Sequence, residues 1–317
     1  MPESIVSASS FIASAEGLSE QTLKVIWRQW AALGAATPSE AAARATVDPE
    51  ALLLASLSFD QFDRRLERLT HDWVVLNADV LSVQRMRNLA ASFPENTHEA
   101  LGELARHAVA DAKDFRWRVL AAGERIPPSK PTRGRVRVSR VPVTGASLIV
   151  RLRLAFGVGV KADLLAFLLG SAPGRWETVR AIARATNYSA GAARRGADAL
   201  AQACVIQRRT AGEFEYSIDH DAWRSLFAPA ADPPPWRDWS HRFAFAAALQ
   251  TLAYRSTDPE TSERVMSMRV SEVLAGDWGG LTESALTEVA DRGTLAEQRN
   301  SLTRIADRLA ATLPHEV

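Results

Sequence analysis

Two pairs of adjacent arginines are the side chains in this sequence best suited to bind an anion. Arg194 and Arg195 form one pair, and Arg208 and Arg209 form the other. A guanidinium group donates hydrogen bonds in a planar fork, which fits phosphate oxygens and the O6 and N7 atoms of guanine. Adjacent residues on a helix project about 100° apart, so one member of the first pair can face bases while the other faces phosphate.

The positive charge of the chain is concentrated around these arginines. Residues 130–209 contain 15 Lys or Arg and three acids, a net charge of +12, whereas residues 1–129 and 210–317 carry −4 and −7. The net charge of the whole chain is only +1. A polyanion responds to charge within about one Debye length, roughly 10 Å, rather than to the molecular total. The pattern therefore favours nucleic acid as a partner.

Patterns typical of catalysis or metal binding are not found in the sequence. The six histidines show no metal-ligand spacing, and the FGVG of residues 156–159 is not followed by the Gly-Lys-Ser/Thr of a phosphate-binding loop. Asp219-His220-Asp221 is interpreted as the acid-rich start of a helix, because neighbouring side chains point apart. We therefore expect no enzyme activity and neither a metal nor another cofactor.

The single cysteine, Cys204, excludes an intrachain disulfide and a cysteine-based zinc cluster. Its place at the end of an Ala-rich helix predicts a small buried residue. No segment approaches the roughly 18 apolar residues of a membrane span, and the N-terminus lacks the basic region of a signal peptide. We expect a cytoplasmic protein that does not enter a membrane.

The elements that position the arginines are predicted to be mainly α-helical. A chain of 317 residues, 47% of them hydrophobic, can form two or three domains. We expect a helical N-terminal domain over 1–122, a basic Pro-rich linker over 123–145, a central domain over 146–228 and a helical C-terminal domain over 236–317. The prolines exclude a helix from the linker, which either lies along a phosphate backbone or is a solvated connection.

The central domain is predicted to combine helices with a short hairpin. Apolar spacing indicates helices over 161–169, 177–185 and 190–203. Asn187 suits the left-handed conformation of the tight turn between the last two, and Ser189 is placed to cap the third helix. Residues 204–209 and 214–218 are predicted as strands around the turn Ala211-Gly212, followed by a closing helix over 219–227.

This order of elements resembles the bacterial winged helix-turn-helix regulators of the multiple-antibiotic-resistance or arsenic-repressor kind. The resemblance covers about residues 160–227 and is carried by IARATNYSAGAARRGADALAQACVIQRRTAGEFEYSID. In that family the third helix enters the major groove, and the hairpin wing lies along the backbone or minor groove. The DNA contacts that we expect are Ser189, Arg194 and Arg195 of the third helix, Arg208 and Arg209 of the wing, Arg184 of the second helix, and Arg135 and Arg137 of the linker.

The third helix departs from the family because it contains Gly191 and Gly196 and few side chains that read bases. Each Gly costs about 1 kcal/mol of helix stability relative to Ala. Such a helix either approaches DNA closely and reads its shape and charge, or binds another protein. We predict a DNA-binding transcriptional regulator. The alternative is a protein-binding adaptor or antitoxin whose winged helix and helical domains bind a partner.

The flanking helices are expected to serve dimerisation or sensing. A homodimer is predicted because one winged helix reads only a short half-site of double-stranded DNA. The apolar segment 236–254 is the candidate dimer seam, and burial within its own domain is the alternative. A second, degenerate helix-turn-helix is considered at 37–58, where AARAT at 42–46 resembles ARAT at 183–186. Asp48 and Pro49 there predict a capped helix start.

Overall fold

The computed structural model describes residues 8–37, 43–121, 123, 144–224, 232–257, 262–278, 281 and 294–316. The chain is mainly α with one small antiparallel sheet, which confirms the predicted fold class at this level. None of the described helices combines the length and the apolar character that a membrane span requires. Most of the predicted linker, including Arg135 and Arg137, lies outside the described residues.

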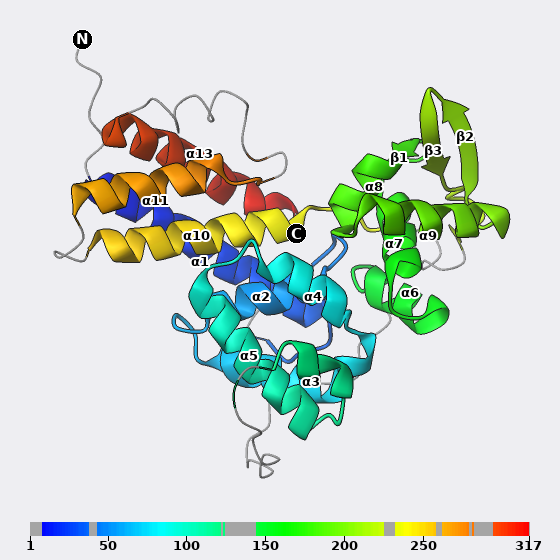
Figure 1. Cartoon of the computed structure of the whole chain (residues 1–317), viewed down its shortest axis with the longest axis horizontal. Coiled ribbons are helices and arrows are strands. Elements are labelled where there is room, and N and C mark those ends of the chain that lie inside the picture. The colour runs from blue at the N-terminus through cyan, green and yellow to red at the C-terminus, as the bar shows by residue number, and fades with distance from the viewer. Residues whose placement is uncertain are drawn as a thin grey trace.

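A helical body is built from both ends of the chain (Figure 1). Helix α1 packs against α10 and α13, so the two ends bury their apolar side chains in one core. The segments predicted as separate N-terminal (1–122) and C-terminal (236–317) domains thus pack as one body. Its elements are α1 (Ala8–Ala32), α2 (Pro49–Phe59), α3 (Arg65–Asn77), α4 (Val83–Ala90), α5 (Glu95–Ala110), α10 (Trp239–Ser256), α11 (Glu263–Ala275), α13 (Leu295–Glu316), and the 3₁₀ helices η1 (Ala78–Val80) and η2 (Phe115–Val119).

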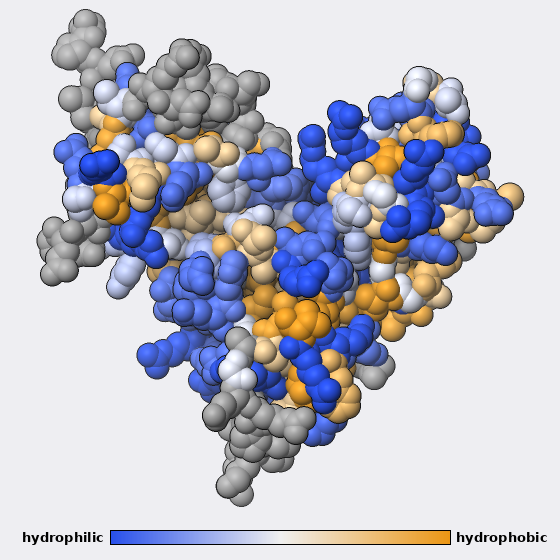
Figure 2. All heavy atoms as spheres, viewed as in Figure 1, coloured by the Kyte–Doolittle hydropathy of each residue, from blue (hydrophilic) through white to orange (hydrophobic). Residues whose placement is uncertain are grey.

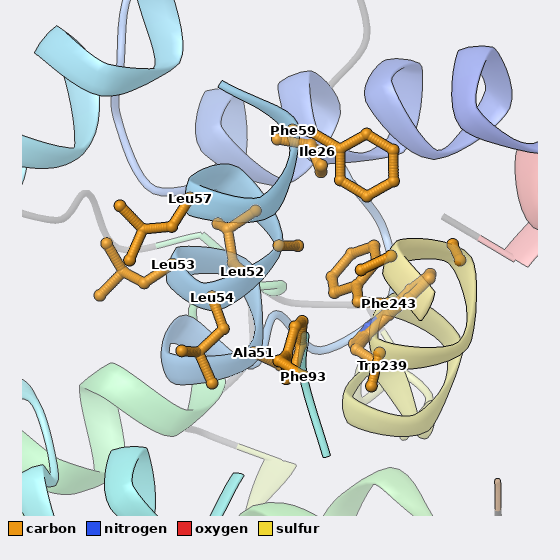
Figure 3. Close-up of a cluster of buried hydrophobic side chains, with 14 of the residues drawn as sticks. Ile26, Ala51, Leu52, Leu53, Leu54, Leu57, Phe59, Phe93, Trp239 and Phe243 are labelled. Carbon is orange, nitrogen blue, oxygen red and sulfur yellow. The ribbon is translucent and has the colours of Figure 1, made fainter. Parts of the chain in front are cut away.

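Helix α2 lies at the centre of the body and is buried along its whole length. Figure 3 shows Trp239 and Phe243 of α10 on the side of α2 that carries Ala51. The predicted helix start is confirmed, because Asp48 accepts a hydrogen bond from the backbone N–H of Ala51. A buried helix cannot enter a DNA groove, and residues 43–48 are not helical. Helix α2 is therefore not the reading helix of a second helix-turn-helix at 37–58, of which residues 38–42 lie outside the described residues.

Helix α10 is buried within its own chain. Trp239, Phe243 and Leu249 are buried, and the indole N–H of Trp239 donates to the carbonyl of Thr46 at 2.9 Å. The helix packs against α1, α2 and α11. The prediction that residues 236–254 form a dimer seam is therefore wrong, because the apolar faces of this helix are already covered. The homodimer itself stays a prediction.

The central module, residues 144–224, has a hydrophobic core of its own and projects from the body (Figure 1). Its core is filled from α6, α7, α8, α9 and the sheet, with Ile182, Leu200 and Tyr216 among the buried side chains. The elements are α6 (Leu148–Phe156), α7 (Val160–Gly170), β1 (Glu177–Thr178), α8 (Val179–Thr186), α9 (Ala190–Gln202), β2 (Gln207–Ala211) and β3 (Glu213–Ser217).

Two crossings of the chain join the central module to the body, and both are hydrogen-bonded to the same short segment. On the way in, the carbonyl of Ala146 accepts from the N–H of Val47 at 2.8 Å. On the way out, the carbonyl of Pro235 accepts from the N–H of Thr46 at 3.0 Å. The next residue, Trp236, donates its backbone N–H to the carbonyl of Gly170. A Cβ added at Gly170 would lie 2.7 Å from the backbone nitrogen of Trp236. Glycine is therefore required at this close approach.

Five ionisable side chains form buried ion pairs where the central module meets the body; we call them the buried charge network. They are Asp48 and Glu50 at the start of α2, Arg85 of α4, Arg153 of α6 and Asp163 of α7, and no side chain among them is more than 5% exposed. Arg85 lies 2.7 Å from Glu50, and Arg153 lies 2.7 Å from Asp163. Burial alone would lower the pKa of both arginines, but the carboxylates raise the pKa of both above its ordinary value.

We predict that Arg153→Met lowers the unfolding free energy by about 3–5 kcal/mol, because the buried carboxylate of Asp163 loses its guanidinium partner and that of Glu50 keeps Arg85 but loses its second guanidinium. Arg224→Met is the matched control. Arg224 is exposed and pairs with exposed Asp221, so its loss should cost at most about 1 kcal/mol. Urea denaturation of the full chain measures both. Equal stability of the two variants would contradict the assignment of the network as a structural centre.

Candidate nucleic-acid interface

The turn between α8 and α9 has the geometry that the sequence predicts. Asn187 ends α8 in the left-handed conformation, with φ 57° and ψ 36°. Ser189 caps α9 by accepting a hydrogen bond from the N–H of Ala192 at 3.3 Å. The hydroxyl oxygen of Ser189, predicted as a DNA contact, is thus already an acceptor, while its proton is free to be donated to a phosphate oxygen.

The three-stranded sheet has the strand order β1-β3-β2. Strands β2 and β3 form the hairpin, and β2 lies at one edge of the sheet. Arg208 is opposite Tyr216, and Arg209 is opposite Glu215. Every residue of β2 is exposed, so the hairpin arginines project from a free edge. Gly212 has φ 82° and provides the turn at the predicted place.

Three local predictions around the hairpin are corrected by the structure. Glu177 pairs with β3 as part of β1, so the second helix begins at Val179 rather than at 177. Cys204 has φ 57° in the turn after α9 and is exposed, not buried, and β2 begins only at Gln207. Residues 220–223 form turns instead of the first part of a closing helix, and Asp219 accepts hydrogen bonds from the backbone N–H groups of Asp221 and Ala222.

Asp198 connects the arginines of α9 with those of the hairpin. Its carboxylate lies 3.7 Å from Arg194 of the same helix and 3.1 Å from Arg208 of β2. The phenol of Tyr216 donates to it at 2.7 Å. This hydrogen bond, together with Arg208, holds the pKa of Asp198 below its ordinary value. Burial and the same carboxylate raise the pKa of Tyr216 to about 12, so the phenol keeps its proton at neutral pH.

Two aromatic rings organise the guanidinium groups on this surface. Arg194 and Arg208 both lie over the ring of Phe214, at 4.8 and 5.3 Å from its centroid. Arg209 lies 4.3 Å from the centroid of Trp176 and pairs with Glu215 at 2.7 Å. A cation over an aromatic face is attracted to the ring electrons, which holds a long side chain in place. Helix and hairpin arginines therefore share one surface, where Figure 2 shows many hydrophilic side chains.

Arg184 and Arg195 differ from the paired arginines. Both are exposed, and no acidic side chain within the described part of the chain forms an ion pair with either. Arg195 follows Arg194 on α9, and its guanidinium reaches back toward exposed Gly191. These two side chains can donate to a phosphate or a base edge without first breaking an ion pair with a carboxylate.

The helix-turn-helix is docked onto the body through its turn. The buried guanidinium of Arg85 donates to the carbonyl of Thr186 at 2.9 Å, and the hydroxyl of Tyr188 lies 3.4 Å from that of Ser82 while donating to Asp163 of its own module at 2.9 Å. Asn88 of α4 donates to the carbonyl of Asn187 at 3.1 Å. The buried charge network therefore fixes the segment that leads into α9.

Sequence reasoning found the arginines of this interface but missed their partners. The sequence predicts Phe214 and Tyr216 only as strand residues and gives Trp176 no role, since their contacts with arginines and Asp198 join segments that are not neighbours in sequence. The local signal for Asp198 was its i, i+4 spacing from Arg194. Conversely, Arg153 counts toward the basic stretch in sequence but is fully buried, so it offers no charge to a ligand.

Comparisons of this chain with protein-family models, with curated proteins and with solved structures find no match.

We predict opposite effects for the two glycines of α9. An added Cβ at Gly196 would lie 3.0 Å from Cγ1 of Val160, so Gly196→Val should overpack the α7–α9 contact and cost about 1–3 kcal/mol. At Gly191 the nearest atom is the flexible end of Arg195 at 3.4 Å, so Gly191→Ala should add up to about 1 kcal/mol. Urea denaturation compares them. A Gly196→Val variant as stable as the unmodified chain would contradict the close packing of these helices.

Proposed function

We propose that the central module is a winged helix-turn-helix that binds double-stranded DNA, and that the protein is a transcriptional regulator. The observation that carries the proposal is the shared surface of α9 and β2, where Arg194 and Arg208 flank Phe214. Helix α9 would enter the major groove, and the hairpin would follow the phosphate backbone. This arrangement is the one implied by the resemblance of residues 160–227 to bacterial winged helix-turn-helix regulators.

Within this proposal the arginines have different roles. Arg195 is the leading candidate for base contact, because it is exposed on α9 and free of a carboxylate partner among the described residues. Arg208 and Arg209 on the edge strand would contact phosphates. Apart from its two arginines and Gln202, the exposed surface of α9 consists of Ala190 and Gly191, which allow close approach but donate no side-chain hydrogen bonds. Readout would then depend mainly on groove shape and charge.

The second candidate function is that of a protein-binding adaptor or antitoxin. The observation in its favour is the exposure of Leu154 and Phe156 at the end of α6, 61% and 45% respectively. Exposed apolar side chains of this size are typical of protein contacts. The proposed homodimer belongs with either function, and it needs a surface other than α10 because that helix is covered within the chain.

The function is tested by salt-dependent binding of labelled duplexes. Affinity should fall as salt rises, with a log–log slope of about −0.9 per phosphate neutralised. Arg194→Ala with Arg195→Ala should cost about 1–3 kcal/mol per lost base contact and relax sequence preference. Arg208→Ala with Arg209→Ala should weaken all duplexes alike and reduce the magnitude of the slope by about 0.9 for each lost phosphate contact. Fluorescence anisotropy measures these changes.

The control for these variants is Arg65→Ala, which removes an exposed arginine from the helical body. It should leave both affinity and slope almost unchanged, since Arg65 lies outside the central module. Absence of DNA binding at low salt would refute the proposed function and favour the adaptor. Unchanged affinity in both folded double variants would refute the proposed docking of α9 and the hairpin.

Asp198 generates a second functional prediction. Its carboxylate competes with phosphate for Arg194 and Arg208. Asp198→Asn should therefore raise duplex affinity at low salt, by up to about fivefold, the equivalent of an exposed ion pair of at most about 1 kcal/mol. The gain should shrink at high salt. Asp221→Asn, which removes an exposed carboxylate from the same module, is the control. A loss of affinity in a folded Asp198→Asn variant would mean that the carboxylate positions the arginines instead of competing for them.

A further inference from the structure

Two histidines and an aspartate from separate segments converge between α3 and α5. Nε2 of His71 on α3 lies 3.2 Å from Oδ2 of Asp111, the residue that follows α5. Nδ1 of His107 on α5 lies 3.2 Å from the same oxygen. The two imidazole rings are perpendicular neighbours with centroids 4.6 Å apart. Three groups that bind transition metals thus present their ligand atoms to one point.

The spacing of these atoms fits a single metal ion. Zn²⁺ binds histidine nitrogen and carboxylate oxygen at about 2.0–2.1 Å in tetrahedral sites, which places neighbouring ligand atoms roughly 3.3 Å apart. The two nitrogen–oxygen distances of 3.2 Å match this value, and all three ligand atoms lie within 4.8 Å of one another. The side chains of the two histidines are about three-quarters buried and that of Asp111 is more deeply buried.

The surroundings of the site also favour a cation. Nδ1 of His71 faces Oδ1 of Asp72 at 3.5 Å, and a carboxylate behind a ligand imidazole orients the ring and raises its basicity. Glu67 and Glu103 precede His71 and His107 by four residues, so each lies one turn away on the same helix face. Burial and the charges of these two glutamates raise the pKa of Asp60.

We propose that His71, His107 and Asp111 bind a divalent transition-metal ion of the Zn²⁺ type, which clamps α3 to α5. Two imidazoles and one carboxylate are ligands of intermediate softness, which suit Zn²⁺ better than Mg²⁺ or Ca²⁺. Three protein ligands leave a fourth position for water. The site lies in the helical body and stands apart from the proposed DNA interface, so it goes beyond the proposed function. No ligand spacing in the sequence indicates this site, because His71 is distant in sequence from the His107/Asp111 pair.

The test uses the full chain after treatment with a chelator. Titration calorimetry with Zn²⁺ should show one ion per chain, and Zn²⁺ should raise the Tm. Co²⁺ in the same site should give the visible absorption of a tetrahedral complex. His71→Gln and His107→Gln should each weaken Zn²⁺ binding more than about 100-fold, and Asp72→Asn should weaken it about 10–100-fold. His315→Gln, an exposed histidine of α13, is the control and should bind as the unmodified chain does.

Each result decides for or against the site. Zn²⁺ binding that is lost in the His71 and His107 variants and kept in the His315 variant supports it, as does a tetrahedral Co²⁺ spectrum. Absence of stoichiometric Zn²⁺ binding by the unmodified chain would overturn the proposal and leave a hydrogen-bonded His–Asp–His cluster. Binding that persists in a folded His107→Gln variant would also overturn it. If the histidine variants do not fold, the Co²⁺ spectrum of the unmodified chain decides.

Discussion

The position of the central module depends on the pairing of charges inside the protein. Glu50, at the start of the buried helix α2, accepts hydrogen bonds from both Arg85 and Arg153. Removing ionised groups from water is expensive, and the cost is offset only when every group has partners in good geometry. Arg153 joins α6 to the body, while Arg85 also holds the carbonyl of Thr186 in the turn before α9. The interior of the chain thus sets the orientation of its exposed arginines.

A fixed module has consequences for the proposed DNA recognition. Helix α9 offers few hydrogen-bonding side chains, so under the proposed function it would gain little by searching for alternative poses. Two chain crossings at Ala146 and Pro235 and the docked turn at Asn187 limit such movement. Arginines held over Phe214 and Trp176 lose less conformational entropy on meeting phosphate than freely rotating ones would. Preorganisation would thus compensate for a reading helix that is poor in specific contacts.

Local signals in the sequence predicted local structure well. Asn187 in the left-handed turn, Ser189 as the cap of α9 and Asp48 as the cap of α2 each depend on a few neighbouring residues, and all three are confirmed. The failures involve contacts between distant segments. The apolar pattern of α10 predicts that the helix is buried but does not identify the surface that covers it. That surface is formed by α1 and α2 of the same chain and not by a second copy. No pattern in the sequence predicts that Arg85, Arg153 and Asp163 form one buried network, because ion pairs between distant segments leave no periodicity in the sequence.

The same distinction applies to charge. The net +12 of residues 130–209 measures composition, whereas a phosphate meets only the guanidinium groups that are exposed and can exchange partners. Arg153 is committed to the interior, and Arg208 and Arg209 already face Asp198 and Glu215. Exposed ion pairs are weak and are screened by salt, so a duplex can displace these carboxylates, but the carboxylates remain nearby and repel it. The DNA affinity of the proposed interface therefore depends on the competition between phosphates and the carboxylates of Asp198 and Glu215 for the arginines. The number of arginines sets only an upper limit on that affinity.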